Sequence, residues 1–464
     1  LSNVEEFLIY GKGMTRGELC DSFFATNVSL ASIFVAIADT EAKGLSAIWL
    51  IISWLVGMLI FWYFYHNSSV RKYLSNGGRT MFDFLGRSYN SLGLRKMAAV
   101  IAIIPYVGSV GVEFYAFVTI LKYVGMPSEY SLPLSLLFTA VTVIYCTFSG
   151  FRGVIKTEPW QRRAILVGWL AFVALLVFAS RQVADSGTFV VETSVEWFTG
   201  EYGIFGNVGL IISSFILFLP FLLSTPDTWQ RIAAVSDEPD TGVWVDSMLK
   251  RGSVGFVLVY GLPVVCGILY LLQFGPGEHV RQGAPLMKPL IVGLNQLPIW
   301  GQALCLGLVL STFAGAVLST ADTLLICAVY TLFYDVLGPA DVHDQPDFKT
   351  RAPIEQRTLL AKARIWTILF GLSSVGVTIL GAIGVGVTPF IWGLFSSLIV
   401  FAPSLLLAAF WPEFSQGRWV CAYGSIILGF VGVFGLLCGA MIWGGEMNYK
   451  VYLVESLPSI GGKM

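Results

Sequence analysis

Apolar stretches of about 20 residues recur along almost the whole chain, and they restrict its fold more than any other feature. An α-helix needs roughly 20 such residues to cross the hydrocarbon core of a bilayer, whereas an outer-membrane barrel shows weaker alternation over about 10 residues. Windows of spanning length lie at 24–41, 46–66, 97–121, 131–149, 160–184, 207–225, 252–275, 299–334, 359–383, 387–411 and 417–444. The sequence therefore predicts an all-α membrane protein with about 11 transmembrane helices.

Composition excludes the main alternatives to a membrane bundle. Only 12% of the residues are charged, which is about half of the fraction typical of soluble domains, so they cannot cover a soluble surface. Aromatic residues make up 14% of the chain, which is too many for a disordered protein. The net charge is −1, so the chain lacks the excess of basic residues that would indicate a nucleic-acid partner.

The 28 basic residues predict which side of the membrane each loop faces. If the residues before the first span are cytoplasmic, 21 basic residues fall in inside loops and 7 in outside loops, as the positive-inside rule requires. We therefore expect an integral protein of a bacterial inner membrane whose residues before the first span lie in the cytoplasm. The opening residues have no signal-peptide pattern, and we expect the numbering to begin inside a longer protein.

The first and sixth spans are poor candidates for continuous helices. Proline lacks a backbone donor, and clustered Ser, Thr and Asn side chains compete for backbone hydrogen bonds. The residues concerned are Thr26, Asn27, Ser29 and Ser32 in span one, and Pro220, Ser224, Thr225 and Pro226 in span six. Either these residues break the helices, or they kink them harmlessly. Spans one and six are the first helices of two successive sets of five, and this correspondence favours broken helices in an inverted repeat. We therefore expect one domain over 1–464, with repeat halves at 21–184 and 207–411 and a peripheral helix at 417–444.

Span eight carries hydroxyl groups on one helical face. Ala316, Ser319, Thr320 and Thr323 are spaced i, i+3, i+4 and i+7, which places them on the same side of the helix. Small residues allow another backbone to approach closely, and hydroxyls beside a freed carbonyl offer the oxygen ligands that an alkali cation needs. The alternative is that these hydroxyls bond their own helix or pack against neighbours.

Three acidic residues lie at or near membrane depth: Asp322, Glu113 and Glu158. A buried carboxylate in a membrane is costly unless it is paired or hydrated, so each is a functional candidate. Each could bind sodium, carry a proton or pair with an arginine or a backbone donor. For Asp322 we favour ion binding over a structural role. For Glu113 the sequence favours neither ion binding nor a structural role. No nucleophile elbow, phosphate loop or HExxH motif occurs, so we expect no enzyme.

Four segments resemble the sodium/solute symporter family, which contains sodium-coupled sugar, proline, sialic acid and monocarboxylate transporters. They are ATNVS at 25–29, FSGFRGVIKTEPWQ at 148–161, PDTWQRIAA at 226–234 and AGAVLSTADTLLICAVYTLFYD at 314–335. Their order and spacing are similar to those of the family over nearly the whole chain. The resemblance implies a LeuT-type fold of five-plus-five helices with broken first and sixth core helices. Members usually have one more helix before this core.

The resemblance also implies a main sodium site. Its ligands would be the backbone carbonyls of Ala25, Val28 and Ala316 and the hydroxyls of Ser319 and Thr320. Part of this set lies on the helical face that the spacing in span eight selects.

Some members have a second sodium site, whose positions correspond here to Glu158, Asp322 and Thr323. Glu158 stands in place of the usual Asp, and Asp322 stands where Ser is common. A proton could therefore replace an ion at this position.

The family's substrate pocket lies between the two broken helices. The residues expected to line it here are Thr26, Ser29, Ser32, Trp54, Tyr106, Glu113, Phe221, Thr225 and Trp392. Sugar-transporting members use acidic and amide side chains where this chain has Ala31, Ser32 and Ile51. A polyhydroxyl ligand would leave its donors unpaired there, so we rank an amino acid or carboxylate above a sugar.

The resemblance implies sodium-coupled secondary active symport of a small organic solute by alternating access. The expected partners are sodium, the solute and the lipid bilayer, and a monomer is possible. The main alternative is a sensory or receptor module that binds solute without transporting it, because fold does not determine function. A channel is a weaker alternative, because no ring of charges or carbonyl filter is visible.

Overall fold

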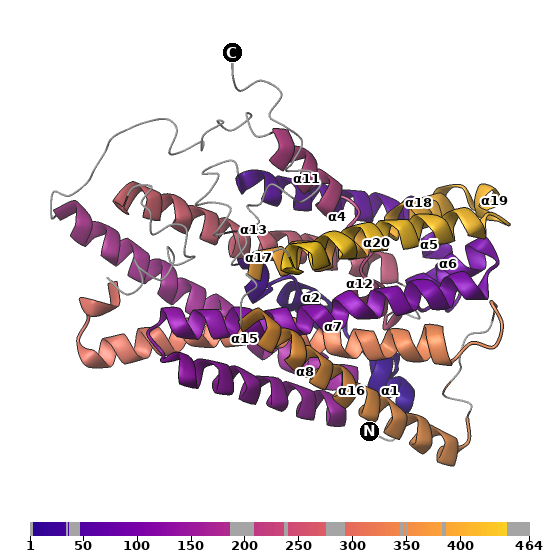
Figure 1. Ribbon diagram of the computed structural model, residues 1–464, viewed down its shortest axis with the longest axis horizontal. Coiled ribbons are helices and arrows are strands. Elements are labelled where there is room, and N and C mark those ends of the chain that lie inside the picture. The colour runs from indigo at the N-terminus through magenta and orange to yellow at the C-terminus, as the bar shows by residue number, and fades with distance from the viewer. Residues whose placement is uncertain are drawn as a thin grey trace.

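The computed structural model describes residues 3–33, 36, 47–185, 208–235, 240–274, 293–343, 348, 351–382 and 387–442. Within these ranges the regular structure is helical and contains no strand. Several of the longest helices, including α7, α8, α15 and α20, run along the long axis of the bundle (Figure 1). This confirms the predicted all-α class.

The helices have the following bounds in chain order. They are α1 Val4–Ile9, α2 Arg16–Thr26, α4 Ile48–Asn67, α5 Ser69–Ser75, α6 Met81–Tyr89, α7 Leu92–Tyr123, α8 Ser128–Asp185, α11 Val208–Phe218, α12 Pro226–Ala233, α13 Thr241–Phe274, α15 Ile299–Thr331, α16 Pro353–Ala382, α17 Val387–Ile399, α18 Ala402–Phe410, α19 Pro412–Ser415 and α20 Trp419–Ile442. A 3₁₀ turn at Tyr10–Lys12 follows α1, and a π-helical segment at Leu332–Leu337 extends α15.

In the described part of the chain, 6 helical segments are long and apolar enough to cross a membrane, as judged by length and composition. They are Ile48–Asn67, Leu92–Lys122, Glu129–Leu175, Ile299–Leu337, Pro353–Ala382 and Gly393–Phe410. The third segment covers most of two predicted spans.

Helix α8 keeps the two predicted spans apart at a break but places helix where a polar connection was predicted. The sequence predicted separate spans at 131–149 and 160–184 with a polar connection between them. In the structure α8 is helical throughout apart from a break at Gly150, whose φ of 56° favours glycine. A Cβ at this position would lie 2.5 Å from the carbonyl oxygen of Phe7 in α1. The polar residues after Gly150 suggested a loop, but tertiary contacts with α1 and α2 accommodate them in a helix.

Predicted span ten, 387–411, also differs from the structure. It consists of α17 and α18, which are separated by a turn at Val400 and Phe401. Pro403 near the start of α18 has no backbone donor, so it is suited to the first turn of a new helix.

The breaks predicted in spans one and six are confirmed. Helix α2 ends at Thr26, and helical structure resumes at Leu30 after three residues of irregular backbone. In span six, α11 ends at Phe218 and α12 begins at Pro226 after a non-helical stretch at 219–225. The irregular residues of both spans lie beside the centre of the bundle.

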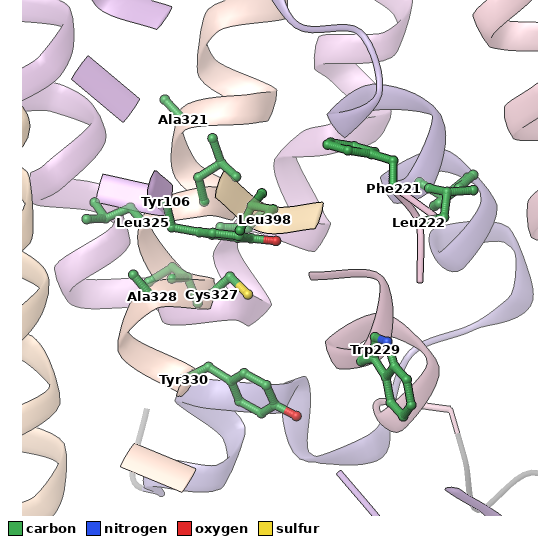
Figure 2. Packing of buried hydrophobic residues seen from close by; sticks show 14 of the residues in the cluster. Tyr106, Phe221, Leu222, Trp229, Ala321, Leu325, Cys327, Ala328, Tyr330 and Leu398 are labelled. Atoms are coloured by element: carbon green, nitrogen blue, oxygen red, sulfur yellow. The ribbon is translucent and has the colours of Figure 1, made fainter. Parts of the chain in front are cut away.

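Helix α15 forms that centre. Every residue from Ser319 to Thr331 is buried, and the helix packs against α8, α7 and α2. Figure 2 shows how its apolar side chains meet those of other helices, with Tyr106, Leu325 and Leu398 together on one side and Phe221 and Leu222 on the other. Because this half of α15 is enclosed, any polar group on it must find a partner inside the protein.

Candidate functional site

The break in the first core helix meets α15 at Ser319. The buried Ser319 hydroxyl lies 2.9 Å from the carbonyl oxygen of Ala25 and 3.0 Å from that of Ala316. The Thr320 hydroxyl lies 3.3 Å from the carbonyl oxygen of Thr26. Three of the predicted sodium ligands therefore converge, since Ala25 and Ala316 contribute carbonyls and Ser319 a hydroxyl.

Val28 lies in the irregular turn beside these oxygens. Its N–H donates to the Ala25 carbonyl over 3.1 Å, and its side chain is buried. Carbonyls at a helix break are free of the regular helical ladder and can turn toward an ion. The oxygens of Ala25, Ala316 and Ser319 thus form a small neutral cluster, which we call the hydroxyl–carbonyl cluster.

A cavity of about 80 Å³ adjoins this cluster. Its lining residues come from both broken helices and from α4, α7, α13, α15 and α17. Most of the predicted substrate residues are among them: Thr26, Ser29, Ser32, Trp54, Tyr106, Phe221 and Thr225. Glu113 does not line the cavity, and the side chain of Trp392 lies outside the described residues.

One wall of the cavity is aromatic. Trp54 stacks on Phe256 with ring centroids 4.5 Å apart and planes inclined by 6°, and Phe256 stacks on Tyr260 at 4.0 Å. Phe221 approaches Trp54 at 5.3 Å from the break in span six. Such ring pairs prefer a few defined geometries, so they provide a rigid apolar surface.

Glu113 stabilises the break in the first core helix from behind the cavity. Its carboxylate accepts hydrogen bonds from the Ser29 hydroxyl, from the Leu30 N–H over 3.0 Å and from the Ala31 N–H over 3.4 Å. The Ser29 oxygen in turn accepts from the Ser32 N–H over 3.0 Å. This geometry favours the structural interpretation of Glu113, in which it links α7 to the irregular turn.

Comparison with known proteins identifies the family. The family model described as "Sodium:solute symporter family" matches residues 7–418. The chain belongs to the sodium:solute symporter family. This membership, together with the long apolar helices, makes the symporter an integral membrane protein and supports sodium-coupled transport of a solute.

Solved structures show where else this fold occurs. The symporter is similar to a Na⁺-coupled sialic acid symporter in a substrate-bound outward-open state, with 15% sequence identity and a TM-score of 0.65 over 96% of this chain and 93% of that chain. It also matches Mhp1, a nucleobase-cation-symport-1 family transporter in a closed conformation with bromovinylhydantoin bound, with 11% identity and a TM-score of 0.49 over 97% of this chain and 98% of that chain. No curated protein sequence matches the chain. The likeness to the sialic acid symporter confirms the LeuT-type fold class.

The symporter carries a charged residue in its cavity that is not among the predicted site residues. Asp227, in the first turn of α12, lines the cavity and accepts a hydrogen bond from the Tyr106 hydroxyl over 2.6 Å. Its other oxygen accepts from Arg231 over 2.8 Å. The predicted span six ends at Thr225, so Asp227 falls in a loop of the predicted topology. The i,i+4 spacing of Asp227 and Arg231 is a sequence pattern that could have indicated a helix here, because it places opposite charges on one helical face.

The residues predicted for a second ion or proton site fall into two groups. The Thr323 hydroxyl donates to the Glu158 carboxylate over 3.3 Å, and Arg231 approaches the same carboxylate oxygen at 3.4 Å. Asp322 instead accepts from the Tyr145 hydroxyl and from the Gln161 amide. Glu158 and Asp322 therefore have different hydrogen-bond partners, and the second site stays a prediction.

A buried ion cluster lies at the other end of the bundle. Arg95 pairs with Asp83 in α6 and, over 3.0 Å, with Asp335 in the π-helical segment. Burial and the neighbouring Asp83 carboxylate raise the pKa of the Tyr73 hydroxyl well above its ordinary value, so Tyr73 remains a donor to Asp83. Glu5 of α1 lies 3.4 Å from Arg79 in the same region. These contacts join the N-terminal helix to the ends of α6, α7 and α15.

Proposed function

We propose that the symporter binds sodium between the broken first core helix and α15 and uses it to drive uptake of a small organic solute by alternating access. The ligands would be the carbonyls of Ala25, Val28 and Ala316 and the hydroxyls of Ser319 and Thr320. One observation carries the proposal: the Ser319 hydroxyl lies within 3.0 Å of carbonyl oxygens from two different helices. Neutral hydroxyl and carbonyl oxygens are suitable ligands for an alkali cation at a discontinuous helix.

The position of this cluster explains how sodium would influence the solute. Thr26 and Thr320 line the cavity and also take part in the contact between the broken helix and α15. Sodium that bridges these helices favours the conformation in which the cavity is formed. By linkage, it raises solute affinity only by the free energy with which it prefers that conformation, and the effect is reciprocal. Rocking of 207–411 against 21–184 would then move the site between the two sides.

The solute is proposed to be an amino acid or a carboxylate rather than a sugar. Many hydroxyls at the cavity already have protein partners, including those of Ser29, Tyr106 and Thr225. A sugar would therefore find few free partners for its own hydroxyls. The indole N–H of Trp54 is buried in the cavity wall and has no partner among the described residues, so it could donate to a carboxylate.

Charge and size are consistent with this proposal. The lining residues include no Lys, Arg or His, and the one carboxylate among them, Asp227, is paired with Arg231, so the bound sodium would supply the countercharge to a carboxylate solute. The cavity of about 80 Å³ is smaller than the engineered cavity of roughly 150 Å³ that accommodates benzene in another protein. A small solute is favoured for that reason.

Uptake into proteoliposomes tests the proposal. Purified symporter would be exposed to labelled amino acids, monocarboxylates and hexoses under an inward sodium gradient. We expect accumulation of one amino acid or carboxylate, with loss of accumulation when potassium replaces sodium or an ionophore dissipates the gradient. Binding without accumulation would contradict symport and support a sensory module, and hexose accumulation would contradict the solute class.

The distribution of basic residues supports an orientation with the residues before the first span in the cytoplasm of a bacterial cell. We expect Trp300→Cys to react with an impermeant maleimide in intact cells and Ile354→Cys only after permeabilisation, because both side chains are exposed and lie at the first turns of α15 and α16, which the predicted orientation places on opposite sides. The exposed native Cys421 would be replaced in both variants. The reverse labelling pattern would contradict the orientation.

A further inference from the structure

Asp227 supplies the cavity with a carboxylate that the proposed sodium site does not use. It lies in the first turn of α12, directly after the break in span six, and its side chain is 13% exposed. The other described residues that line the cavity are all uncharged. A single negatively charged side chain therefore lies in an otherwise neutral wall.

Tyr106 of α7 fixes the orientation of this carboxylate. Its hydroxyl donates to Oδ1 of Asp227 over 2.6 Å and accepts from the Asp227 backbone N–H over 3.3 Å. Tyr106 is itself buried and lines the cavity. If the carboxylate rotated out of the cavity wall, the buried hydroxyl would lose its acceptor, so the position of Asp227 is well defined before a solute binds.

The ion pair with Arg231 leaves hydrogen-bonding capacity on Asp227. Arg231 donates to Oδ2 over 2.8 Å, whereas Oδ1 accepts only from Tyr106 among the described residues. A carboxylate offers about four acceptor positions, so Oδ1 can accept a further hydrogen bond. Arg231 also lies 3.4 Å from the Glu158 carboxylate, so its positive charge is divided between two acids.

A purely structural role does not explain why Asp227 lies in the cavity wall. An i,i+4 pair with Arg231 could form within α12 wherever that helix packed. The contact with Tyr106, which is 121 positions away, is what brings the carboxylate to the cavity. The arrangement thus provides a charged acceptor at a place where a solute can reach it.

An ammonium group is the solute group that suits this acceptor. It carries a positive charge and several donors, and hydrogen bonds between charged partners are about twice as strong as those between neutral ones. It is also small enough for a cavity of about 80 Å³. The hydroxyls of Thr225 and Thr228, which lie 3.0 Å apart in the same wall, are neutral acceptors for its remaining donors.

We propose that Asp227 binds the ammonium group of the solute, and that the symporter therefore selects amino acids over carboxylates that lack this group. The inference deepens the proposed function and rests on it, because it chooses between the two solute classes named there. Asp227 is a residue that determines specificity, and Tyr106 is a positioning residue that acts through it.

The experiment compares the binding of amino acids and of their deaminated counterparts to the full chain in lipid nanodiscs with sodium present. The probes are the proteinogenic amino acids, hexoses and, for each amino acid that binds, the carboxylate without its amino group, such as propionate for alanine. We expect at least one amino acid to bind and its deaminated counterpart to bind at least about tenfold more weakly.

Substitutions then assign this preference to Asp227. Asp227→Asn removes the charge and should weaken amino-acid binding at least about tenfold without weakening the deaminated carboxylate, whereas a structural role would weaken both together. Asp227→Glu keeps the charge and should retain more of the preference. Asp246→Asn is the matched control, because Asp246 is 48% exposed and lies outside the cavity, and its preference should be unchanged.

The outcomes separate this inference from the proposed function. The inference would be overturned if a wild-type carboxylate bound as tightly as its amino acid, if no amino acid bound, or if Asp227→Asn weakened both ligands equally. If Asp227→Asn does not fold, Tyr106→Phe decides, because it removes the positioning hydroxyl and should lower the preference; an unchanged preference would overturn the inference. Amino-acid binding that did not depend on sodium would overturn the proposed function and leave the role of Asp227 intact.

Discussion

The Ser319 hydroxyl is the most direct point at which to test the sodium site. It is completely buried and lies 2.9 Å and 3.0 Å from the carbonyl oxygens of Ala25 and Ala316. Ser319→Ala removes this oxygen and changes the side-chain volume very little. Because it acts on one atom between two helices, the substitution should affect ion binding more than folding.

The structure allows the size of each effect to be estimated. An interaction between a polar group and a charge contributes about 1.5–3 kcal/mol, and each 1.4 kcal/mol is about a factor of ten in affinity. We therefore expect the sodium affinity of Ser319→Ala to fall by roughly 10- to 150-fold. The hydrogen bond between the helices contributes only about 0.6 kcal/mol on average in a membrane protein, so the sodium-free variant should remain folded.

Calorimetric titration of purified protein with sodium measures this affinity without a known solute. Ser311→Ala is the matched control, because Ser311 lies on the same helix and bonds the carbonyl of Leu308 in that helix over 2.7 Å. Its sodium affinity should stay within about twofold of the wild type, since no ligand is lost. Ser319→Ala combined with Thr320→Ala should reduce sodium binding further. An unchanged affinity in Ser319→Ala would refute the assignment of this hydroxyl.

Three further substitutions test other parts of the site and fold. Glu113→Ala leaves three buried donors without their acceptor and should lower the thermal unfolding temperature. Glu113→Gln should have an unfolding temperature between those of Glu113→Ala and the wild type. Equal unfolding temperatures of all three proteins would contradict the role of Glu113 in anchoring the irregular turn. Trp54→Ala removes the ring that stacks on Phe256 at 4.5 Å and should weaken solute binding at least about tenfold in a titration. Trp54→Phe keeps an aromatic ring and should retain more solute affinity. An equal loss of affinity in both variants would argue against an aromatic wall. Gly150→Ala combines a positive φ with a Cβ that would lie 2.5 Å from the Phe7 carbonyl oxygen, so it should lower the unfolding temperature. Gly417→Ala is the control and should lower it less, because Gly417 has a φ of 74° but a Cβ there would meet no atom within 4 Å. Equal unfolding temperatures of the two variants would show that the close approach of Gly150 to α1 is unimportant.

The buried ion pairs of this protein connect its local breaks to the whole bundle. Arg231 joins α12 to α2, and Arg95 joins α7 to α6 and the end of α15. Removing one partner of such a pair leaves an uncompensated charge, which is strongly destabilising. A transport cycle must therefore preserve these pairs or exchange them for others, and this restricts which helices can move independently.

Several features of the site follow from local sequence. The breaks near Asn27 and Pro220 arise from residues that weaken a helix wherever it packs. The spacing of Ser319 and Thr320 places their hydroxyls close together on any regular helix, and the structure brings both to the broken segment. These properties depend on neighbours within a few residues, so they could be predicted before the helices were assembled.

Other features depend on residues far apart in the chain. Asp227 and Tyr106 are 121 positions apart, and Arg231 and Thr26 are 205 positions apart. The polar stretch after Gly150 was predicted as a connection, because hydropathy alone does not reveal which charges find partners in other helices.

The sequence alone determined that this chain is a membrane bundle, where two of its helices break and which helical face carries hydroxyl groups. These properties follow from hydrophobicity and helical periodicity, which act over short stretches of chain. The family resemblance implied that Ser319 and Ala25 share a site, but only the tertiary structure showed their contact, and it alone decided that Glu113 supports the irregular turn and that Arg231 lies beside Glu158. The physical reason is that the cost of burying a polar group depends on the partner it meets, and helix packing brings that partner from a distant part of the chain.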